Sequence, residues 1–371
     1  MRNGYRIVDT DCHQIEPAGM WMESIDPTFR ERAPKLAEVG DHRGIVVEGE
    51  SITNEAGKYP MSPPEFRAAV ARGMVRFKRA AQSGFDARSR LDDMDEQGVD
   101  VQVIYPTVGG QILGKPFRDP ELLAAICRAY NEWSRDYCAA DPQRLRWAAM
   151  LPMQESALAI EEARRAAARG CVGFYVRPNP VQGRNLYHAD NAPLWSTIEA
   201  LEKPICIHDS GSPYWPSYGD RMDTHTSGHI LAHPFEAMSA LMGLIWYGVI
   251  ERHPRLRVVH VEADAGWVPY WLQRMEQHWE FSGNAEHPGL RKPPTEYFLS
   301  NFLVAARGDE RTLPAAVELV GDRSFAFNTD YPHPDGTWPW GIERLCDTSA
   351  IPEQSKRRIL WDNAARAFSL A

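Results

Sequence analysis

The sequence predicts a (β/α)8 TIM barrel, and three observations lead to that prediction. Short apolar or β-branched runs alternate with longer amphipathic stretches along almost the whole chain. Such alternation is typical of parallel strands covered by helices. Eight such repeats within 371 residues fit a closed barrel better than an open sheet. No change in composition and no linker divides the chain, so we expect one domain over residues 1–371.

The expected elements follow from the period of the apolar residues. The eight expected strands are residues 5–10, 99–105, 145–151, 172–176, 204–208, 256–262, 298–304 and 325–329. The expected helices are residues 85–97, 120–140, 156–169, 192–201, 234–252, 268–281 and 310–319, with a final helical stretch at 352–368.

Two stretches fall outside this repeat. Residues 16–64 form an insertion after the first strand, with a hairpin expected around 45–51, and we expect this insertion to cover the barrel mouth. Residues 208–233 form a loop rich in Gly, Pro and aromatic residues after the fifth strand. Long loops after barrel strands belong to the catalytic face, so both stretches are expected there.

Composition excludes several classes of partner. The net charge is −9 and the basic residues form no stripe or tail, which argues against nucleic acid. No apolar run approaches the roughly 18–20 residues needed to cross a bilayer, and the first residues lack a secretory signal. The six cysteines form no CxxC pair, which is typical of a reducing compartment. We therefore expect a cytoplasmic protein without a membrane partner.

Side chains of metal-ligand type fall at the ends of three expected strands. Asp11 and His13 lie two residues apart just after the first strand, so an extended backbone places both on one face. His208 ends the fifth strand and Asp330 follows the eighth. Catalytic groups of such barrels lie at strand C-termini. We therefore predict one divalent metal ion, with Zn²⁺ favoured, Mn²⁺ or Fe²⁺ as alternatives, and Mg²⁺ or Ca²⁺ less suited.

Four segments resemble the amidohydrolase-related barrel enzymes, in the branch that contains aminocarboxymuconate-semialdehyde decarboxylase and the resorcylate and carboxyvanillate decarboxylases. They are residues 7–17 (IVDTDCHQIEP), 204–208 (PICIH), 248–254 (GVIERHP) and 328–333 (NTDYPH). The segments occur in the family's order across nearly the whole chain. The resemblance implies that Asp11, His13, His208 and Asp330 ligate the metal and that Asp330 also handles protons. Asp11 is a departure, because many relatives have His there and some decarboxylases have Glu.

The sixth expected strand leaves the catalytic base open. Relatives carry a His there, and counting back from Pro269 places that His opposite Ala263. His260 and Glu262 lie nearby, two residues apart on a predicted strand, and are therefore expected on one face. Either could be the base. His has the intrinsic pKa better suited to a proton shuttle at neutral pH.

The remaining residues are candidates for contact with the substrate. Arg177 follows the fourth strand and either clamps a substrate carboxylate or forms a structural ion pair. His229 and His233 are four residues apart, but Pro234 indicates that His233 precedes a helix. We expect one of the two to reach the pocket, and hydrogen bonding within the loop rather than a second metal site.

His333 follows Asp330 by three residues and is expected to orient it or to contact substrate. Trp215, in the loop after the fifth strand, and Trp338 and Trp340, after the eighth, are candidates for the wall of a pocket for a planar substrate.

Together with the resemblance, these residues predict a metal-dependent decarboxylase of a small aromatic or unsaturated carboxylic acid that uses no organic cofactor. The alternative is hydrolysis of an amide, a lactone or a carbon–carbon bond next to a carbonyl, with hydroxide on the metal as nucleophile. A barrel that has lost catalysis and serves as a binding protein is disfavoured by the intact ligand set. We expect a small-molecule substrate and a homodimer.

Overall fold

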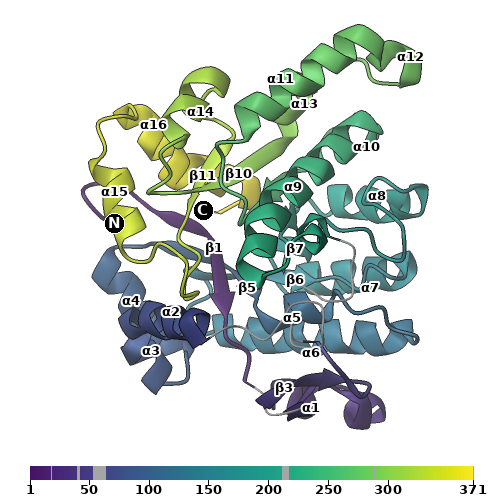
Figure 1. The fold of residues 1–371 in the computed structure, drawn as a ribbon, viewed down its shortest axis with the longest axis vertical. Helices are drawn as coiled ribbons and strands as arrows, with labels where there is room; N and C mark the ends of the chain where they lie inside the picture. Colours follow the sequence, from purple (N-terminus) through teal and green to yellow (C-terminus); the bar gives the residue numbers. More distant parts are fainter. Residues whose placement is uncertain (18, 40–41, 53–63, 211–216, 288, 371) are drawn as a thin grey trace.

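Eight parallel strands form a nearly closed barrel in the computed structural model. Figure 1 shows helices arranged around the barrel strands. The structure describes residues 1–17, 19–39, 42–52, 64–210, 217–287 and 289–370. In sheet order the strands are β1 (Val8–Gln14), β5 (Val101–Pro106), β6 (Leu145–Met150), β7 (Gly173–Val176), β8 (Ile205–Ile207), β9 (Val258–His260), β10 (Phe302–Arg307) and β11 (Phe325–Asn328). The predicted (β/α)8 architecture is confirmed.

The barrel closes where its first and last strands meet. The amide of His13 donates to the carbonyl of Tyr331 at 2.6 Å, and the amide of Asp330 donates to the carbonyl of Asp11 at 2.9 Å. Two residues before Asp11 in the same strand, the Asp9 carboxylate accepts a hydrogen bond of 2.8 Å from the amide of Thr329. The two chain segments that carry the predicted acidic ligands are therefore hydrogen-bonded to each other.

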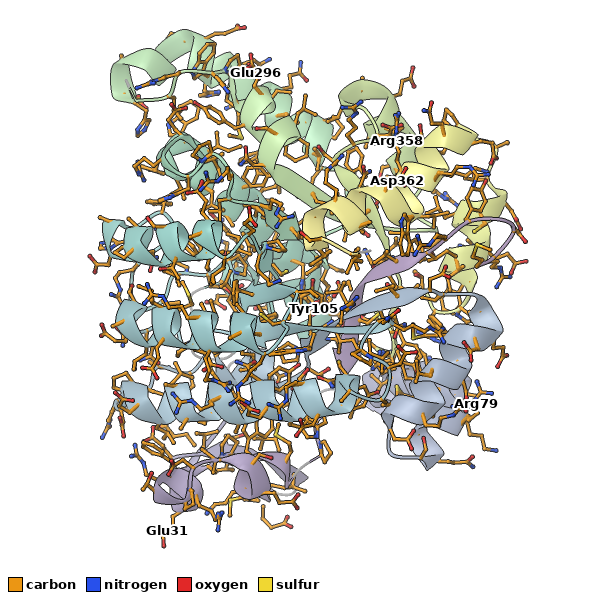
Figure 2. The ribbon with its side chains drawn as sticks, turned by 180° about the vertical axis from the view of Figure 1, so that it is seen from behind. Glu31, Arg79, Tyr105, Glu296, Arg358 and Asp362 are labelled. Carbon is orange, nitrogen blue, oxygen red and sulfur yellow. The ribbon has the colours of Figure 1, made fainter. Side chains whose placement is uncertain are left out.

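Helices cover the outside of the barrel. Along one flank α6 (Pro120–Cys138), α7 (Ser156–Ala168) and α8 (Ala192–Ala200) lie side by side (Figure 2). The remaining longer helices are α4 (Ala87–Gln97), α9 (His225–Trp246), α11 (Val268–His278), α13 (Pro294–Asn301), α14 (Leu313–Val320) and α15 (Trp340–Asp347). Shorter ones are α3 (Lys78–Gln82), α5 (Val108–Ile112), α10 (Val249–Arg252), α12 (Asn284–Glu286), α16 (Glu353–Arg357) and α17 (Asn363–Phe368). None of these described helices is long and apolar enough to cross a membrane.

Two predicted elements are shifted in the structure. The strand expected at 298–304 begins only at Phe302, because Pro294 opens α13 and the helix continues to Asn301. The helix expected from 234 begins nine residues earlier, at His225. Thr224 caps it, its side chain accepting from the amide of Ser227, and the helix continues through Pro234. A helix of 22 residues tolerates the loss of the one backbone hydrogen bond that an internal proline removes.

The insertion after β1 forms α1 (Met20–Ser24) and an antiparallel sheet of β2 (Lys35–Val39), β3 (His42–Val47) and β4 (Glu50–Ser51). The predicted hairpin is the β3–β4 pair. This unit packs beside α6, and none of its described residues lines the cavity at the barrel mouth. That role belongs to the next helix, α2 (Pro64–Met74), through Ala69 and Val70.

Candidate metal centre and active site

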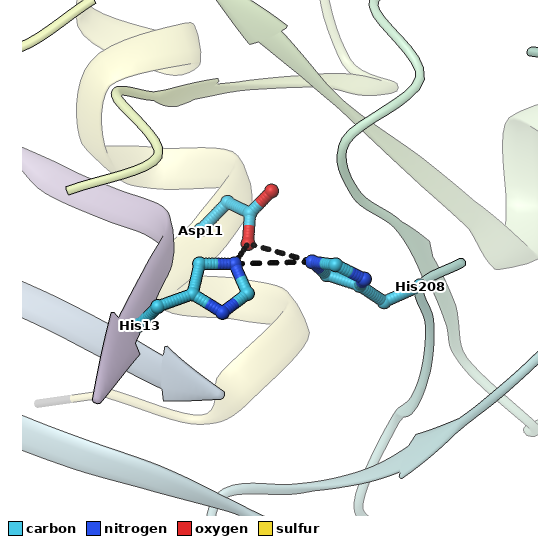
Figure 3. Close-up of side chains that lie close together, drawn as sticks. All are labelled: Asp11, His13 and His208. Carbon is cyan, nitrogen blue, oxygen red and sulfur yellow. Dashed lines mark hydrogen bonds and ion pairs between the residues drawn. The ribbon is translucent and has the colours of Figure 1, made fainter. Parts of the chain in front are cut away.

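Asp11, His13 and His208 converge on one point at the carboxyl ends of β1 and β8 (Figure 3). His13 Nε2 lies 3.4 Å from Asp11 Oδ1 and 3.1 Å from His208 Nε2, and His208 Nε2 lies 3.7 Å from Asp11 Oδ1. All three residues are buried. Together these atoms form three sides of a site that could hold one cation.

The hydrogen bonds behind the rings fix which nitrogens carry protons. His13 Nδ1 faces the carbonyl of Pro106 at 3.0 Å, and His208 Nδ1 faces the carbonyl of Asp209 at 2.5 Å. A carbonyl oxygen only accepts, so each Nδ1 donates and each neutral ring presents a lone pair at Nε2. The two Nε2 atoms lie 3.1 Å apart. His208 Nε2 also lies 2.8 Å from Glu262 Oε2, and although burial lowers the pKa of His208, the Glu262 and Asp11 carboxylates raise it to about 9, so without an ion this nitrogen carries a proton.

Asp11 fits the same interpretation. Both of its carboxylate oxygens are buried and have no hydrogen-bond partner among the described residues. Burial raises the pKa of this carboxyl well above its usual range, which shows how poorly the protein alone compensates its charge. A buried carboxylate without donors, next to two imidazole Nε2 atoms, is a ligand set that suits a divalent metal ion.

Asp330 and His333 form the side of the site that belongs to β11. Asp330 Oδ1 lies 3.4 Å from His13 Nε2 and pairs with His333 Nδ1 at 2.7 Å. The His333 ring stacks on His13 with centroids 4.0 Å apart, and its Nε2 contacts Thr107 Oγ1 at 3.0 Å. Burial raises the pKa of Asp330 to about 6. Burial opposes protonation of His333, but the adjacent Asp330 carboxylate raises its pKa to about 9.

The structure brings Glu262, and not His260, to the site. Glu262 has a left-handed backbone with φ of 57°, and its Oε2 lies 2.8 Å from His208 Nε2. Strand alternation therefore does not extend from His260 to Glu262, because β9 ends at His260. The sequence-based expectation that both share one face was wrong.

His260 points toward the helices that cover the barrel. Tyr175 faces the interior, where its ring meets that of His208 at 5.5 Å, and Cys206 and then Val259 follow it in register. Residues in register share a face, so His260, next to Val259, faces outward. Its ring lies 6.0 Å from that of Phe302, and burial lowers its pKa to about 3.

His229 and His233 both lie on α9, which corrects the expectation that Pro234 would exclude them from a helix. Their rings are 4.0 Å apart and face Glu262. His229 Nε2 is 3.6 Å from Glu262 Oε1, and His233 Nδ1 is 3.9 Å from Glu262 Oε2. Burial lowers the pKa of His233 to about 4.

These groups open onto a cavity of about 550 Å³. Apolar side chains, hydroxyls, carboxylates and imidazoles share its wall. The lining residues are His13, Ala69, Val70, Pro106, Thr107, Gln111, His208, Asp209, Ser210, Thr226, His229, Ile230, His233, Glu262, His333, Pro334 and Asp335. Sequence reasoning did not select Thr107, Gln111, Asp209 or Ser210. Thr107 directly follows β5, so inspection of every strand end would have found it.

Two other predicted contacts, Arg177 and Trp338, do not line this cavity, and a third lies outside the described residues. The Arg177 guanidinium is buried and paired with Asp209 Oδ1 at 2.8 Å, and it also donates to the Gly110 carbonyl at 3.1 Å. The ion-pair alternative is therefore the one that the structure contains. Trp338 is buried against Tyr331, with ring centroids 4.8 Å apart. Trp215 lies outside the described residues.

A (β/α)8 barrel with carboxylates and imidazoles gathered at its strand ends defines a class of metal-dependent barrel enzymes. The chain belongs to the amidohydrolase family, because the family model described as Amidohydrolase matches residues 8–370. With this family and its decarboxylase relatives, the chain is an enzyme whose chemistry is decarboxylation or hydrolysis.

Sequence relatives and solved structures agree with this family. A gamma-resorcylate decarboxylase from Polaromonas sp. strain JS666 is 29% identical over 304 residues, which cover 77% of this chain and 87% of the relative. A 2-amino-3-carboxymuconate-6-semialdehyde decarboxylase from Dictyostelium discoideum is 26% identical and covers 79% of each chain. An amidohydrolase from Mycobacterium avium subsp. paratuberculosis K-10 superposes with a TM-score of 0.79 at 22% identity, over 98% of this chain and 99% of its own.

Proposed function

We propose that this enzyme is a metal-dependent decarboxylase of a small aromatic or unsaturated carboxylic acid. The observation that carries the proposal is the convergence of His13 Nε2 and His208 Nε2, 3.1 Å apart, on the buried carboxylate of Asp11, whose oxygens have no hydrogen-bond partner among the described residues. The named decarboxylases among the relatives supply the reaction class.

Asp11, His13, His208 and Asp330 would hold the ion. A bound divalent ion supplies a positive charge that can hold a substrate carboxylate and a neighbouring oxygen and draw electron density from the reacting carbon. Zn²⁺ suits this donor set, and a dihydroxybenzoic acid decarboxylase from Polaromonas sp. JS666 crystallised with manganese makes Mn²⁺ an equal candidate.

The cavity wall suits a small planar acid. Pro106, Val70 and Ile230 provide apolar surface for a ring or a conjugated chain. Thr107 and Gln111 provide polar groups that can hydrogen-bond to substituents such as ring hydroxyls. The substrate would thereby be held with its carboxyl carbon toward the cluster at the base.

Proton delivery falls to Asp330 or Glu262. In decarboxylation, the bond between the ring carbon and the carboxylate carbon breaks, its electron pair stays on the ring carbon, and that carbon gains one proton as carbon dioxide leaves. A protonated Asp330 carboxyl can donate this proton, and His333 Nδ1, 2.7 Å away, can return one. Glu262 is the second candidate because it lines the cavity beside His208.

The position of Glu262 also supports the hydrolytic alternative. A carboxylate that lines the cavity and lies 2.8 Å from His208 Nε2 is placed to take a proton from water as it attacks a carbonyl carbon. An amide, a lactone or a carbon–carbon bond next to a carbonyl would be the substrate in that case.

The experiment that separates these reactions is carbon balance. Purified enzyme loaded with Mn²⁺ or Zn²⁺ is incubated with 2,6-dihydroxybenzoate, 5-carboxyvanillate and related acids, and released carbon dioxide is quantified against the decarboxylated product. Equal amounts of both are expected, and Asp330→Asn serves as the inactive control. Products that keep every carbon or gain water would exclude decarboxylation.

A further inference from the structure

We propose that His229, His233 and Glu262 form a second metal-binding site beside the first. This inference rests on the first ion of the proposed function. The three residues come from α9 and from the segment just after β9, so none of them belongs to the four ligands already assigned.

The spacing within this cluster fits ligands of one ion better than hydrogen bonds. Glu262 Oε1 is 3.6 Å from His229 Nε2, and Glu262 Oε2 is 3.9 Å from His233 Nδ1. Both separations exceed the hydrogen-bond range of about 2.7–3.2 Å. Two ligands at about 2.0–2.2 Å from a tetrahedral ion lie roughly 3.3–3.6 Å apart, so a small shift would complete the site.

The orientation of the helix supports the same conclusion. His229 and His233 are one helical turn apart on α9, and both turn toward Glu262. His233 is buried, and its Nδ1 has no hydrogen-bond partner among the described residues. A buried ring nitrogen aimed at a carboxylate, but too far from it to bond, is accounted for by an ion between the two.

The first ion changes the contacts of Glu262. In the structure the closest contact of Glu262, 2.8 Å, is with His208 Nε2. Once His208 Nε2 ligates the first ion, it can no longer donate a hydrogen bond to Glu262. The Glu262 carboxylate, which also faces His229 and His233, is then available as a ligand of a second ion.

Metal stoichiometry tests the proposal without relying on activity. The full chain is stripped with a chelator, dialysed against Mn²⁺, and its metal content measured by plasma mass spectrometry. We expect about two ions per chain in the wild type and about one in the His229→Ala/His233→Ala variant, as for other two-metal sites. A matched control, His188→Ala/His278→Ala, removes two exposed imidazoles elsewhere and should keep both ions.

The outcomes separate the two proposals. Wild type with a single ion that Asp11→Asn removes would refute the second site and leave the first intact. Wild type and the α9 variant with equal metal content would also refute it, and the carboxylate would then pair with a protonated imidazole. Wild type without metal would refute both proposals.

If the α9 variant does not fold, as judged by circular dichroism, wild-type crystals grown with Mn²⁺ decide the matter. Two separate anomalous peaks, one at Asp11 and one between His229 and His233, are the expected result. A lone peak at Asp11 would overturn the second site.

Discussion

Replacement of His260 by phenylalanine tests whether this residue packs the barrel wall or serves as a base. The ring is buried between Phe302 and Trp267, with centroids 6.0 and 6.3 Å away. Neither ring nitrogen has a hydrogen-bond partner among the described residues. Phenylalanine keeps the aromatic contacts and removes both unsatisfied nitrogens, so we expect a variant that is more stable by about 1–3 kcal/mol at neutral pH and fully active.

The pH dependence of stability makes this prediction quantitative. Burial lowers the pKa of His260 to about 3 in the folded chain, whereas an unfolded histidine has a pKa of about 6.5. Between these values the unfolded chain binds a proton that the folded chain does not. Protonation of His260 in the unfolded chain therefore lowers the free energy of unfolding as pH falls below about 6.5, by about 1.4 kcal/mol per pH unit. At pH 5 the loss is about 2 kcal/mol.

Urea unfolding followed by tryptophan fluorescence, at about pH 7.5 and about pH 5, measures this loss. The stability of His260→Phe should fall by about 2 kcal/mol less than that of the wild type over this interval. His278→Gln, which removes an exposed histidine, should show the wild-type dependence. Equal pH dependence of the His260→Phe variant and the wild type, or a loss of kcat in the variant, would refute the packing role.

Three further substitutions test the site itself. Asp11→Asn should abolish activity and the binding of the ion at His13 and His208. The metal-free variant should nevertheless melt above the metal-free wild type, because the substitution removes a buried carboxylate without donors; calorimetry of both apo proteins checks this. Arg177→Ala should destabilise the fold by about 3–5 kcal/mol, because it leaves the Asp209 carboxylate buried and unpaired; a rise in KM without a change in Tm would instead favour a substrate clamp. Glu262→Gln should lower kcat by about 100-fold or more if the carboxylate transfers a proton, as steady-state kinetics will show.

The regular part of the barrel was predictable because strand period and helix period are local properties of the sequence. All eight strands were found, since each is a short buried run between amphipathic helices. Only the start of β10 was predicted wrongly, because the apolar Phe298 lies in the last turn of α13. The rings of Phe298 and Phe302 stack with centroids 6.0 Å apart, so both side chains are buried against each other. Because an apolar residue is expected at both positions in a helix and in a strand, the sequence pattern does not show where the helix ends and the strand begins.

The clustered side chains could be predicted only where a strand continued to the residue in question. Asp11 and His13 lie in the last half of β1 and His208 directly follows β8, so strand ends located them even though β1 shifts register between Asp9 and Cys12. Glu262 lies beyond the end of β9 in a left-handed conformation, and alternation from His260 gave the wrong face. Arg177 illustrates a different gap, because its partner Asp209 lies 32 residues away and only tertiary structure brings the two together.

The closure of the barrel has a consequence for how the enzyme is made. Asp11 lies in the first strand and Asp330 just after the last, and the two segments join by hydrogen bonds between their own backbones. A ribosome must therefore release almost the whole chain before Asp330 can meet Asp11, and a chain truncated before β11 lacks one of the four proposed ligands. A nascent chain stalled upstream of residue 325 should bind an ion at Asp11 more weakly than the complete chain.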